Sequence, residues 1–456
     1  MTLSREIFAV FIILISSTCF GSLTSFPGPA ASSMKKLYPG LANYTEEWDI
    51  FNNAPRFTAA AGSIIFYPFV VRFGRQLSIS IAAFINGLLY LLILPVNENS
   101  MTYILVIRFL HGFIWGYMSA LTLVYLIETS PSNSYSFTGC MHQFFNVFGI
   151  CLNNVLAAFC DFRNLAIVCS IISFVFSGLV WLIRDSPVSA QDKARRLAKK
   201  TRKAAIKKMK MTKNDEKNVF SRKDHMNEFK SSEELKLDSL DDMTTIISSQ
   251  SSEGLFSKKY FPIVIKAIIL FVFQQFCGTN AILSNLSSIM SKSGLSLDPN
   301  IQSFLANAAQ LVAVLITAFL VDSFGAKFLW CLSSSLLVIL LLAYGFTTYY
   351  DTPSFVPVLC IFLYRLCFGL GVGPLTYAIW VQLFSDSTRL GGTMIMMAAH
   401  WLVSWVVVYT FPIMNQNIGS LYTVIIYAIS TFISIFYGAF CIPDTREKDT
   451  EEMALI

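Results

Sequence analysis

The sequence predicts an all-α membrane protein of twelve transmembrane helices arranged as two repeats of six. Composition, the length of the apolar segments and an internal repeat support this fold class. Of the 456 residues, 54% are hydrophobic and only 14% are charged, and the mean hydropathy is +0.58. An average soluble domain has about 25% charged residues. The composition therefore favours a chain that is solvated by lipid.

Twelve apolar segments are long enough to cross a bilayer, which takes about 20 residues each. They lie near residues 7–28, 48–71, 77–95, 102–126, 137–159, 164–183, 261–290, 300–321, 327–348, 355–384, 391–413 and 419–441. The predicted organisation is an N-terminal six-helix half (1–184), a central loop (185–258), a C-terminal six-helix half (259–442) and a tail (443–456).

The distribution of basic residues predicts the orientation in the membrane. More than half of the 34 lysines and arginines lie between Arg184 and Lys259. Because positively charged loops stay in the cytoplasm, we expect the central loop and both termini to be cytoplasmic, in the plasma membrane. The basic section from Ala190 to Lys213 is expected to lie on the anionic inner leaflet, and nucleic acid is not an expected partner. The acidic and serine-rich remainder of the loop is either a solvated linker or a regulatory segment.

No chemistry-bearing constellation indicates an enzyme. The ten cysteines are scattered singly, without the spacing of a disulfide framework or a zinc site. No nucleophile, metal site or phosphate-binding loop is recognisable, so no cofactor is expected. In the first loop predicted to be outside, Asn43 begins the tripeptide Asn-Tyr-Thr and is a possible glycosylation site.

Three pairs of anchor motifs recur at similar offsets, which indicates a duplicated six-span unit. RFGR at Arg72 matches SFGA at Ser323, 251 residues later. Arg108 and the two glycines that follow it repeat at Arg365, 257 residues later, and Asp185 matches Asp444, 259 residues later. Parallel repeats of this kind are typical of major facilitator transporters, which hold substrate between the halves at the midplane and alternate access by rocking.

Amide side chains within the spans predict the substrate site. Gln274, Gln275 and Asn280 lie in a segment otherwise apolar enough to cross the membrane. Amides at this depth keep their hydrogen-bonding capacity only where they face protein or a water-filled cavity, so they favour an uncharged, hydroxyl-rich solute. These three side chains would not share one face of a regular helix, but a local break at Gly278 would aim all of them inward.

Two further spans carry polar stripes, and two carry aromatic faces. The stripes are Gln143, Asn146 and Asn153 in the fifth span and Asn307, Gln310 and Thr317 in the eighth. The alternative for each stripe is a set of interhelical hydrogen bonds, worth about 0.6 kcal/mol on average. Tyr377 in the tenth span and His400 with Trp401 in the eleventh are candidates to face a sugar ring, with core or lipid packing as the alternative.

These motifs resemble those of the sugar porter family of the major facilitator superfamily, particularly its facilitative hexose transporters. QQFCGTNAI resembles the family's QQxxGxN, the His142-Gln143 pair its HQ, and GVGPLTY at Gly371 its GPGPIPW. The resemblance covers both halves. It implies a substrate-binding set of Gln143, Gln274, Gln275, Asn280, Gln310, Tyr377, His400 and Trp401.

The resemblance also implies a charged network that controls the conformational cycle. YLIETSP at Tyr125 is similar to the family's YxxExxP. The implied members are Gly74, Arg75, Arg108, Glu128, Asp322 and Arg389. The chain departs from the family at Val71, Tyr135 and Gln382, and at Ser284-Asn285 where the family has two tyrosines. We therefore expect a less strongly held outward-open state and a different outer gate or selectivity.

The predicted function is facilitated diffusion of a hexose, with glucose as the first candidate. Residues Ile7 to Ala31 contain no Asp, Glu or His. A proton relay needs a group that titrates, so passive uniport is favoured over a proton-coupled sugar symporter, and His400 is the one candidate that would reverse this. A transporter-like sugar sensor without flux is the other alternative. The sugar's identity and the oligomeric state stay open.

Overall fold

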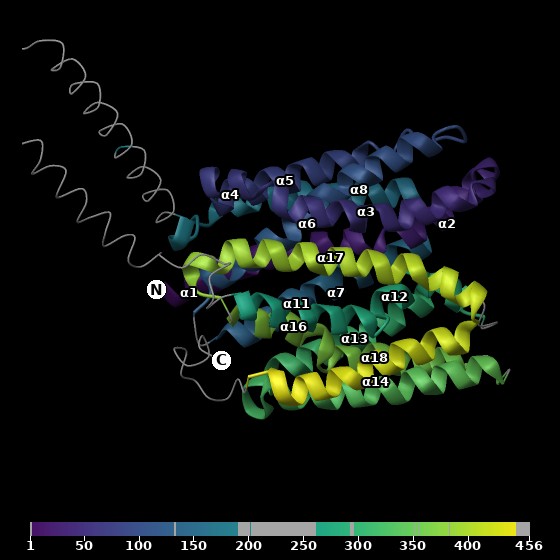
Figure 1. Ribbon diagram of the computed structural model, residues 1–456. Helices are drawn as coiled ribbons and strands as arrows, with labels where there is room; N and C mark the ends of the chain where they lie inside the picture. The colour runs from purple at the N-terminus through teal and green to yellow at the C-terminus, as the bar shows by residue number, and fades with distance from the viewer. Residues whose placement is uncertain are drawn as a thin grey trace, which may run out of the picture.

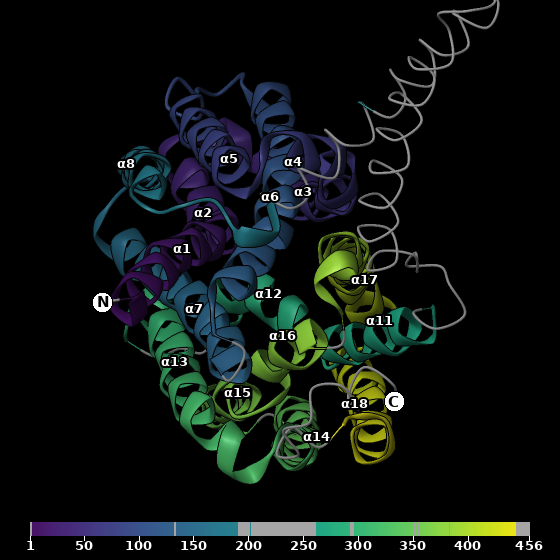
Figure 2. The ribbon, with the colours of Figure 1, turned by 90° about the vertical axis from the view of Figure 1, so that its left-hand side faces the viewer.

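The chain folds into a bundle of helices that run side by side along one direction (Figure 1). The computed structural model describes residues 2–131, 134–189, 201, 261–291, 296–350, 352–353, 355–382 and 384–443. The start of α1 (Thr2–Ser25) and the end of α18 (Ser420–Cys441) lie at the same end of the bundle, called the terminal end here, and the opposite end is called the distal end (Figure 2). The predictions for the basic segment after residue 189 and for the tail after residue 443 lie outside the described residues.

The N-terminal half contains five of its predicted spans as single helices and the second span as a bent pair. Its α-helices are α1 (Thr2–Ser25), α2 (Pro27–Leu37), α3 (Thr45–Ile65), α4 (Tyr67–Phe73), α5 (Arg75–Leu91), α6 (Met101–Thr129), α7 (Tyr135–Phe159) and α8 (Phe162–Leu179). Short 3-10 helices at Pro39–Asn43 and Val180–Leu182 follow α2 and α8. The axes of α3 and α4 meet at 45°, and together they form the second span.

The C-terminal half repeats this order with two broken spans. Its helices are α11 (Phe261–Phe276), α12 (Thr279–Ser291), α13 (Pro299–Phe324), α14 (Ala326–Tyr349), α15 (Phe355–Gly369), α16 (Val372–Gln382), α17 (Asp386–Asn417) and α18 (Ser420–Cys441). Within the described residues, eight segments are long and apolar enough to cross a membrane, or nine with the α3–α4 pair. The shorter or more polar α5, α7 and α11–α12 run along the same direction and complete the twelve spans (Figure 1).

The repeat is visible in the backbone of two equivalent turns. Gly74 ends α4 with φ at 93°, and Gly325 ends α13 with φ at 79°. These are the glycines of the RFGR and SFGA motifs. Residues with a Cβ rarely adopt this backbone conformation, so each motif needs glycine where the chain reverses into the next helix.

The two halves meet along matching pairs of helices. In the N-terminal half, α3 packs on α17 and α7 packs on α13 and α16. Large apolar side chains such as Phe319, Ile339 and Phe440 remain exposed on the outside of the bundle, as expected of a surface solvated by lipid. The polar residues of α7, α11 and α13 are instead buried in the interior, where the halves meet.

Candidate functional site

A cavity of about 50 Å³ lies between the halves, and helices from both contribute to its wall. All eight residues that the sequence predicts for substrate binding line this one cavity. They are Gln143 of α7, Gln274 and Gln275 of α11, Asn280 of α12, Gln310 of α13, Tyr377 of α16, and His400 and Trp401 of α17. The structure therefore brings together side chains that are up to 258 positions apart.

A break in the seventh span aims three amides at the cavity. Gly278 has a φ of 86° between the end of α11 and the start of α12, where the sequence predicts a break. Asn280 Nδ2 donates to Gln275 Oε1 at 2.6 Å, and Gln274 Nε2 donates to the Gly373 carbonyl at 3.1 Å. These bonds hold the amides in fixed orientations instead of leaving them free to rotate.

His400 completes this amide chain. Its Nδ1 lies 3.1 Å from Gln275 Nε2. An amide nitrogen only donates, so Nδ1 acts as the acceptor in this arrangement and the imidazole is neutral. Asn280 Nδ2 also donates to Ser404 Oγ at 2.9 Å. The seventh and eleventh spans are thus joined by polar contacts at the cavity wall.

The fifth and eighth spans present acceptors that have no partner. Asn146 Nδ2 lies 3.4 Å from Gln143 Oε1, while Asn146 Oδ1 is buried without a hydrogen bond among the described residues. Gln310 Oε1 is likewise buried without a hydrogen bond among the described residues. Both residues line the cavity. Buried acceptors without a partner are costly, so these two atoms mark a place where a ligand hydroxyl or a water is needed.

Other members of the predicted stripes bond to neighbouring helices instead. Asn153 Nδ2 donates to the Ser22 carbonyl at 2.8 Å, and Thr317 Oγ1 donates to the Gly369 carbonyl at 3.1 Å. Asn307 Oδ1 accepts a bond from Arg365 at 2.5 Å. Each stripe therefore divides: Gln143, Asn146 and Gln310 face the cavity, while Asn153, Asn307 and Thr317 join helices.

Aromatic rings form one wall of the cavity and cross the boundary between the halves. The ring centroids of Trp401 and Trp115 are 4.6 Å apart, and those of Trp401 and Phe20 are 5.6 Å apart. Trp401 Nε1 donates to Ser119 Oγ of α6 at 3.0 Å. The eleventh span is thus attached to the first and fourth spans at this wall.

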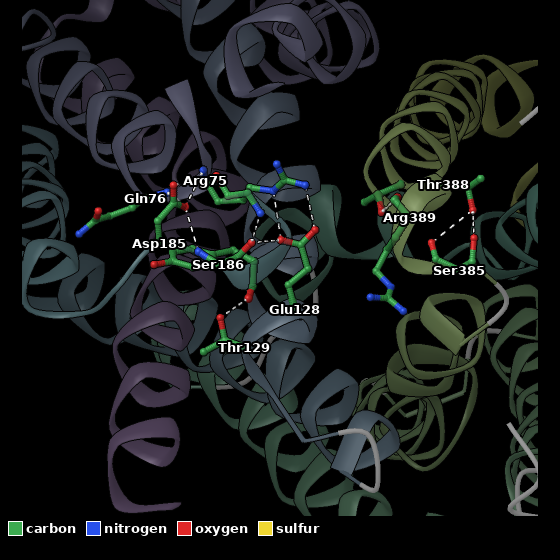
Figure 3. Close-up of polar contacts among 12 residues, drawn as sticks. Arg75, Gln76, Glu128, Thr129, Asp185, Ser186, Ser385, Thr388 and Arg389 are labelled. Atoms are coloured by element: carbon green, nitrogen blue, oxygen red, sulfur yellow. Dashed lines mark hydrogen bonds and ion pairs between the residues drawn. The ribbon is translucent and has the colours of Figure 1, made fainter. Parts of the chain in front are cut away.

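Part of the predicted charged network lies elsewhere, at the terminal end (Figure 3). Arg75 binds Glu128 with two parallel bonds of 3.0 Å each, and both side chains are almost completely buried. The Ser186 hydroxyl donates to the same carboxylate. Asp185 Oδ1 accepts the backbone N–H groups of Arg75 and Gln76 at 3.0 and 3.1 Å, which satisfies the first turn of α5. We call Arg75, Glu128, Asp185 and Ser186 the terminal-end cluster.

Arg108 does not join this cluster, which corrects the sequence-based grouping. It lies on α6 twenty residues before Glu128, about 30 Å away along the helix. It is buried there, with its guanidinium 5.2 Å from the centre of the Phe51 ring. The grouping was wrong because the two residues occupy opposite ends of a single helix.

The remaining members of the predicted network lie in the C-terminal half. Arg389 of α17 faces the cluster (Figure 3), interacts electrostatically with Glu128, and lies 5.7 Å from the centre of the Tyr135 ring. Asp322 lies exposed near the end of α13, and no contact places it in the cluster. Asn43 is exposed in the short helix after α2, so glycosylation there stays a prediction.

Sequence reasoning missed two residues with a bearing on the cavities between the halves. Arg365 of α15 lines the cavity described above, and Arg56 of α3 lines a smaller one beside it. The signal was available, because an arginine inside an apolar span is costly and marks a functional-site candidate. The sequence assigns Arg365 only as the repeat equivalent of Arg108.

Comparison with known proteins agrees with this architecture. A profile of the family described as Sugar (and other) transporter matches residues 9–456. The facilitated trehalose transporter Tret1 of Apis mellifera ligustica is 24% identical, over 99% of this chain and 88% of its own length. Sugar transporter ERD6-like 6 of Arabidopsis thaliana is also 24% identical, over 97% of this chain and 88% of its own.

Two solved structures have the same fold at low sequence identity. The proton:xylose symporter XylE bound to 6-bromo-6-deoxy-D-glucose superposes with a TM-score of 0.75 at 19% identity, covering 99% of both chains. A partially occluded inward open conformation of the xylose transporter XylE from E. coli gives 0.71 at 18% identity, covering 98% of this chain and 99% of the other.

Two six-helix halves around a polar cavity define a membrane transporter of the major facilitator superfamily. The family match extends over almost the whole chain. The chain belongs to the Sugar (and other) transporter family; it is a sugar transporter and not an enzyme.

Proposed function

We propose that this protein carries a hexose across the plasma membrane by facilitated diffusion, with D-glucose as the first candidate. The observation that carries the proposal is the pair of buried acceptors, Asn146 Oδ1 and Gln310 Oε1, that have no partner among the described residues. They lie in a cavity whose wall also holds Gln143, Gln275 and Asn280. A solute with several hydroxyls satisfies such acceptors, and leaving them unpaired is costly.

The aromatic wall supports a ring-shaped solute. Trp401 and Tyr377 present apolar ring surface to the same cavity that the amides line. The C–H face of a hexose packs on such rings while its hydroxyls pair with amides. In this proposal His400 orients Gln275, to which it is bonded at 3.1 Å.

Contacts on both sides of the cavity support alternating access. At the distal end Arg56 donates to Ser284 at 2.7 Å, joining α3 to α12. At the terminal end Arg389 lies over Tyr135, joining α17 to α7. The halves thus touch on both sides of the cavity, as in an occluded intermediate. Opening either side requires one of these two sets of contacts to separate.

The cavity chemistry supports uniport over proton symport. Within the described residues the wall contains no Asp or Glu, and His400 is held as a neutral acceptor. Proton-coupled transport is the second candidate mechanism, because the structurally similar XylE is a proton:xylose symporter. Trehalose is a second candidate substrate, because the insect relatives are facilitated trehalose transporters.

Uptake into proteoliposomes that contain the purified full chain tests these alternatives. We expect radiolabelled D-glucose to equilibrate without accumulating, at a rate that an imposed proton gradient does not change. Uphill accumulation that a protonophore abolishes would establish symport. Faster uptake of trehalose than of glucose would reassign the substrate, and binding of sugar without flux would establish a sensor.

A further inference from the structure

Two fully buried arginines line the two adjoining cavities between the halves. Arg365 is 1% exposed and lines the amide cavity, and Arg56 is 2% exposed and lines a cavity of about 30 Å³. Thr24 and Leu283 belong to the walls of both cavities, so the two spaces are neighbours. The sequence-based expectation of an uncharged site took neither arginine into account.

Among the described residues, each guanidinium donates hydrogen bonds only to neutral groups. Arg365 donates to Thr279 Oγ1 at 3.0 Å and to Asn307 Oδ1 at 2.5 Å. Arg56 donates to the Asn52 carbonyl at 2.6 Å and to Ser284 Oγ at 2.7 Å. The Nε–H of each arginine is buried and has no acceptor within the described part of the chain. Both side chains are thus held in place, and the Nε–H of each stays available as a hydrogen-bond donor.

The positive charge around these cavities is not balanced by the described residues. Neither cavity wall contains a described Asp or Glu. Arg108 adds to the imbalance, because it is also fully buried and interacts electrostatically with Arg56. A buried charge is normally retained only with a partner of opposite charge, so the missing partner is expected to arrive with the ligand.

We propose that the site accepts a hexose that carries a carboxylate, a hexuronate, with the carboxylate on Arg365 and the hydroxyls on the amides that line the same cavity. A planar guanidinium with a free N–H suits a carboxylate, whose two oxygens accept parallel or forked bonds. Arg365 and the amides line the same cavity, so one small solute contacts both, and Arg56 adds a second positive charge in the adjoining cavity. The proposal rests on the proposed function, since it names the substrate class of the same site.

Uptake of radiolabelled D-glucuronate and D-glucose by proteoliposomes containing the full chain tests this assignment. We expect glucuronate to enter at least as fast as glucose. Arg365→Gln should lower glucuronate uptake by about tenfold or more and glucose uptake by less than about threefold, because only the acidic sugar loses its counter-charge. An inside-positive membrane potential should accelerate glucuronate uptake and leave glucose unchanged, since one anion crosses alone.

Controls separate this proposal from misfolding and from simple anion binding. Arg72→Gln removes an exposed arginine and should change neither uptake. Arg365→Lys keeps the charge and should retain part of the glucuronate uptake. Arg56→Gln removes the charge in the adjoining cavity and should lower glucuronate uptake less than Arg365→Gln does. Glucose uptake without glucuronate uptake would overturn the proposal and leave the proposed function standing. Inhibition of glucose uptake by inorganic phosphate, again without glucuronate uptake, would show an anion site only and overturn the proposal as well. Uptake of neither sugar would overturn both.

Discussion

The two halves of this transporter share a fold but differ in where their polar contacts lie. The N-terminal half has a buried ion pair at the terminal end, where Arg75 binds Glu128 beside Asp185. In the C-terminal half, Ala326 stands at the position equivalent to Arg75, and Ser385 lies 257 residues after Glu128. This half instead contributes the chain of amide contacts at the cavity, around the break at Gly278. The difference suggests that the first half acts as a frame and the second carries most of the substrate site.

The largest expected effect is on the free energy of unfolding, through the buried ion pair of the N-terminal half. Arg75→Ala leaves the Glu128 carboxylate buried without its counter-charge, which should destabilise the protein by about 3–5 kcal/mol. The measurement is the thermal unfolding midpoint in detergent. The double variant Arg75→Ala/Glu128→Gln should recover part of this loss, because no lone charge remains.

Arg72→Gln is the matched control for this prediction. Arg72 precedes Arg75 by three residues but is exposed, so its replacement should leave the midpoint unchanged. Equal shifts for the two variants would remove the basis for calling the N-terminal half a frame. Unchanged transport kinetics in Glu128→Gln would also contradict the expectation that this cluster holds one conformation of the cycle.

A smaller effect is expected from straightening the seventh span. Gly278→Ala places a Cβ in a backbone conformation with φ at 86° and 3.0 Å from the Tyr427 ring. The strain should cost about 1–3 kcal/mol and turn Asn280 away from Gln275, so transport should fall. Initial uptake rates at saturating sugar measure the loss.

Gly419→Ala is the corresponding control. Gly419 has nearly the same φ, 85°, but its Cβ would meet nothing within 4 Å. This variant should be strained but active. Comparable loss of transport in both variants would mean that backbone strain alone, and not the aim of the amides, explains the effect.

Exchanging one amide in each half tests the division of roles directly. Gln275→Ala removes the link between His400 and Asn280 and should weaken apparent sugar affinity by about tenfold, with some loss of stability because buried partners are left unpaired. Asn153→Ala removes the interhelical bond to Ser22 and should lower the thermal midpoint while leaving sugar affinity unchanged. Sugar titration and thermal unfolding of both variants check this. Loss of affinity in Asn153→Ala would contradict the assignment of that residue to packing.

The smallest effect concerns the contact that joins the halves beside the cavity. Trp401→Phe keeps a ring but removes the 3.0 Å bond to Ser119, worth about 1 kcal/mol. Ser119→Ala removes the same bond from the other side. Each variant should change apparent sugar affinity to a similar extent, and the double variant should add nothing further. Additive changes would show that the two side chains act independently.

The sequence was sufficient for the spans and for most of the cavity. Apolar segment length defined the spans because a bilayer has a fixed thickness. Amides within those segments must face protein or a water-filled cavity, which restricted where they could lie. The division within each stripe was not predictable. Asn146 and Asn153 have the same side chain on the same helix, and their roles differ because α1 brings the Ser22 carbonyl to Asn153 alone.

The buried arginines show the same limit of prediction from sequence. Arg108 and Arg365 are equivalent in the repeat, yet only Arg365 lines the cavity. Symmetry in the sequence therefore did not give symmetry in environment, and the spans that carry the two arginines also differ: α15 ends at Gly369, whereas α6 continues unbroken to Thr129. Only the assembled helices reveal which arginine faces the space between the halves.

The close pair of indoles formed by Trp401 of the cavity wall and Trp115 behind it has an optical consequence. Trp115 and Trp401 come from different halves, and their ring centroids are 4.6 Å apart. Chromophores at this separation couple their electronic transitions and give paired circular dichroism bands of opposite sign. In the proposed alternating-access cycle the halves rock apart, which should separate the pair and weaken the couplet, so the pair would serve as a label-free spectroscopic reporter of that motion.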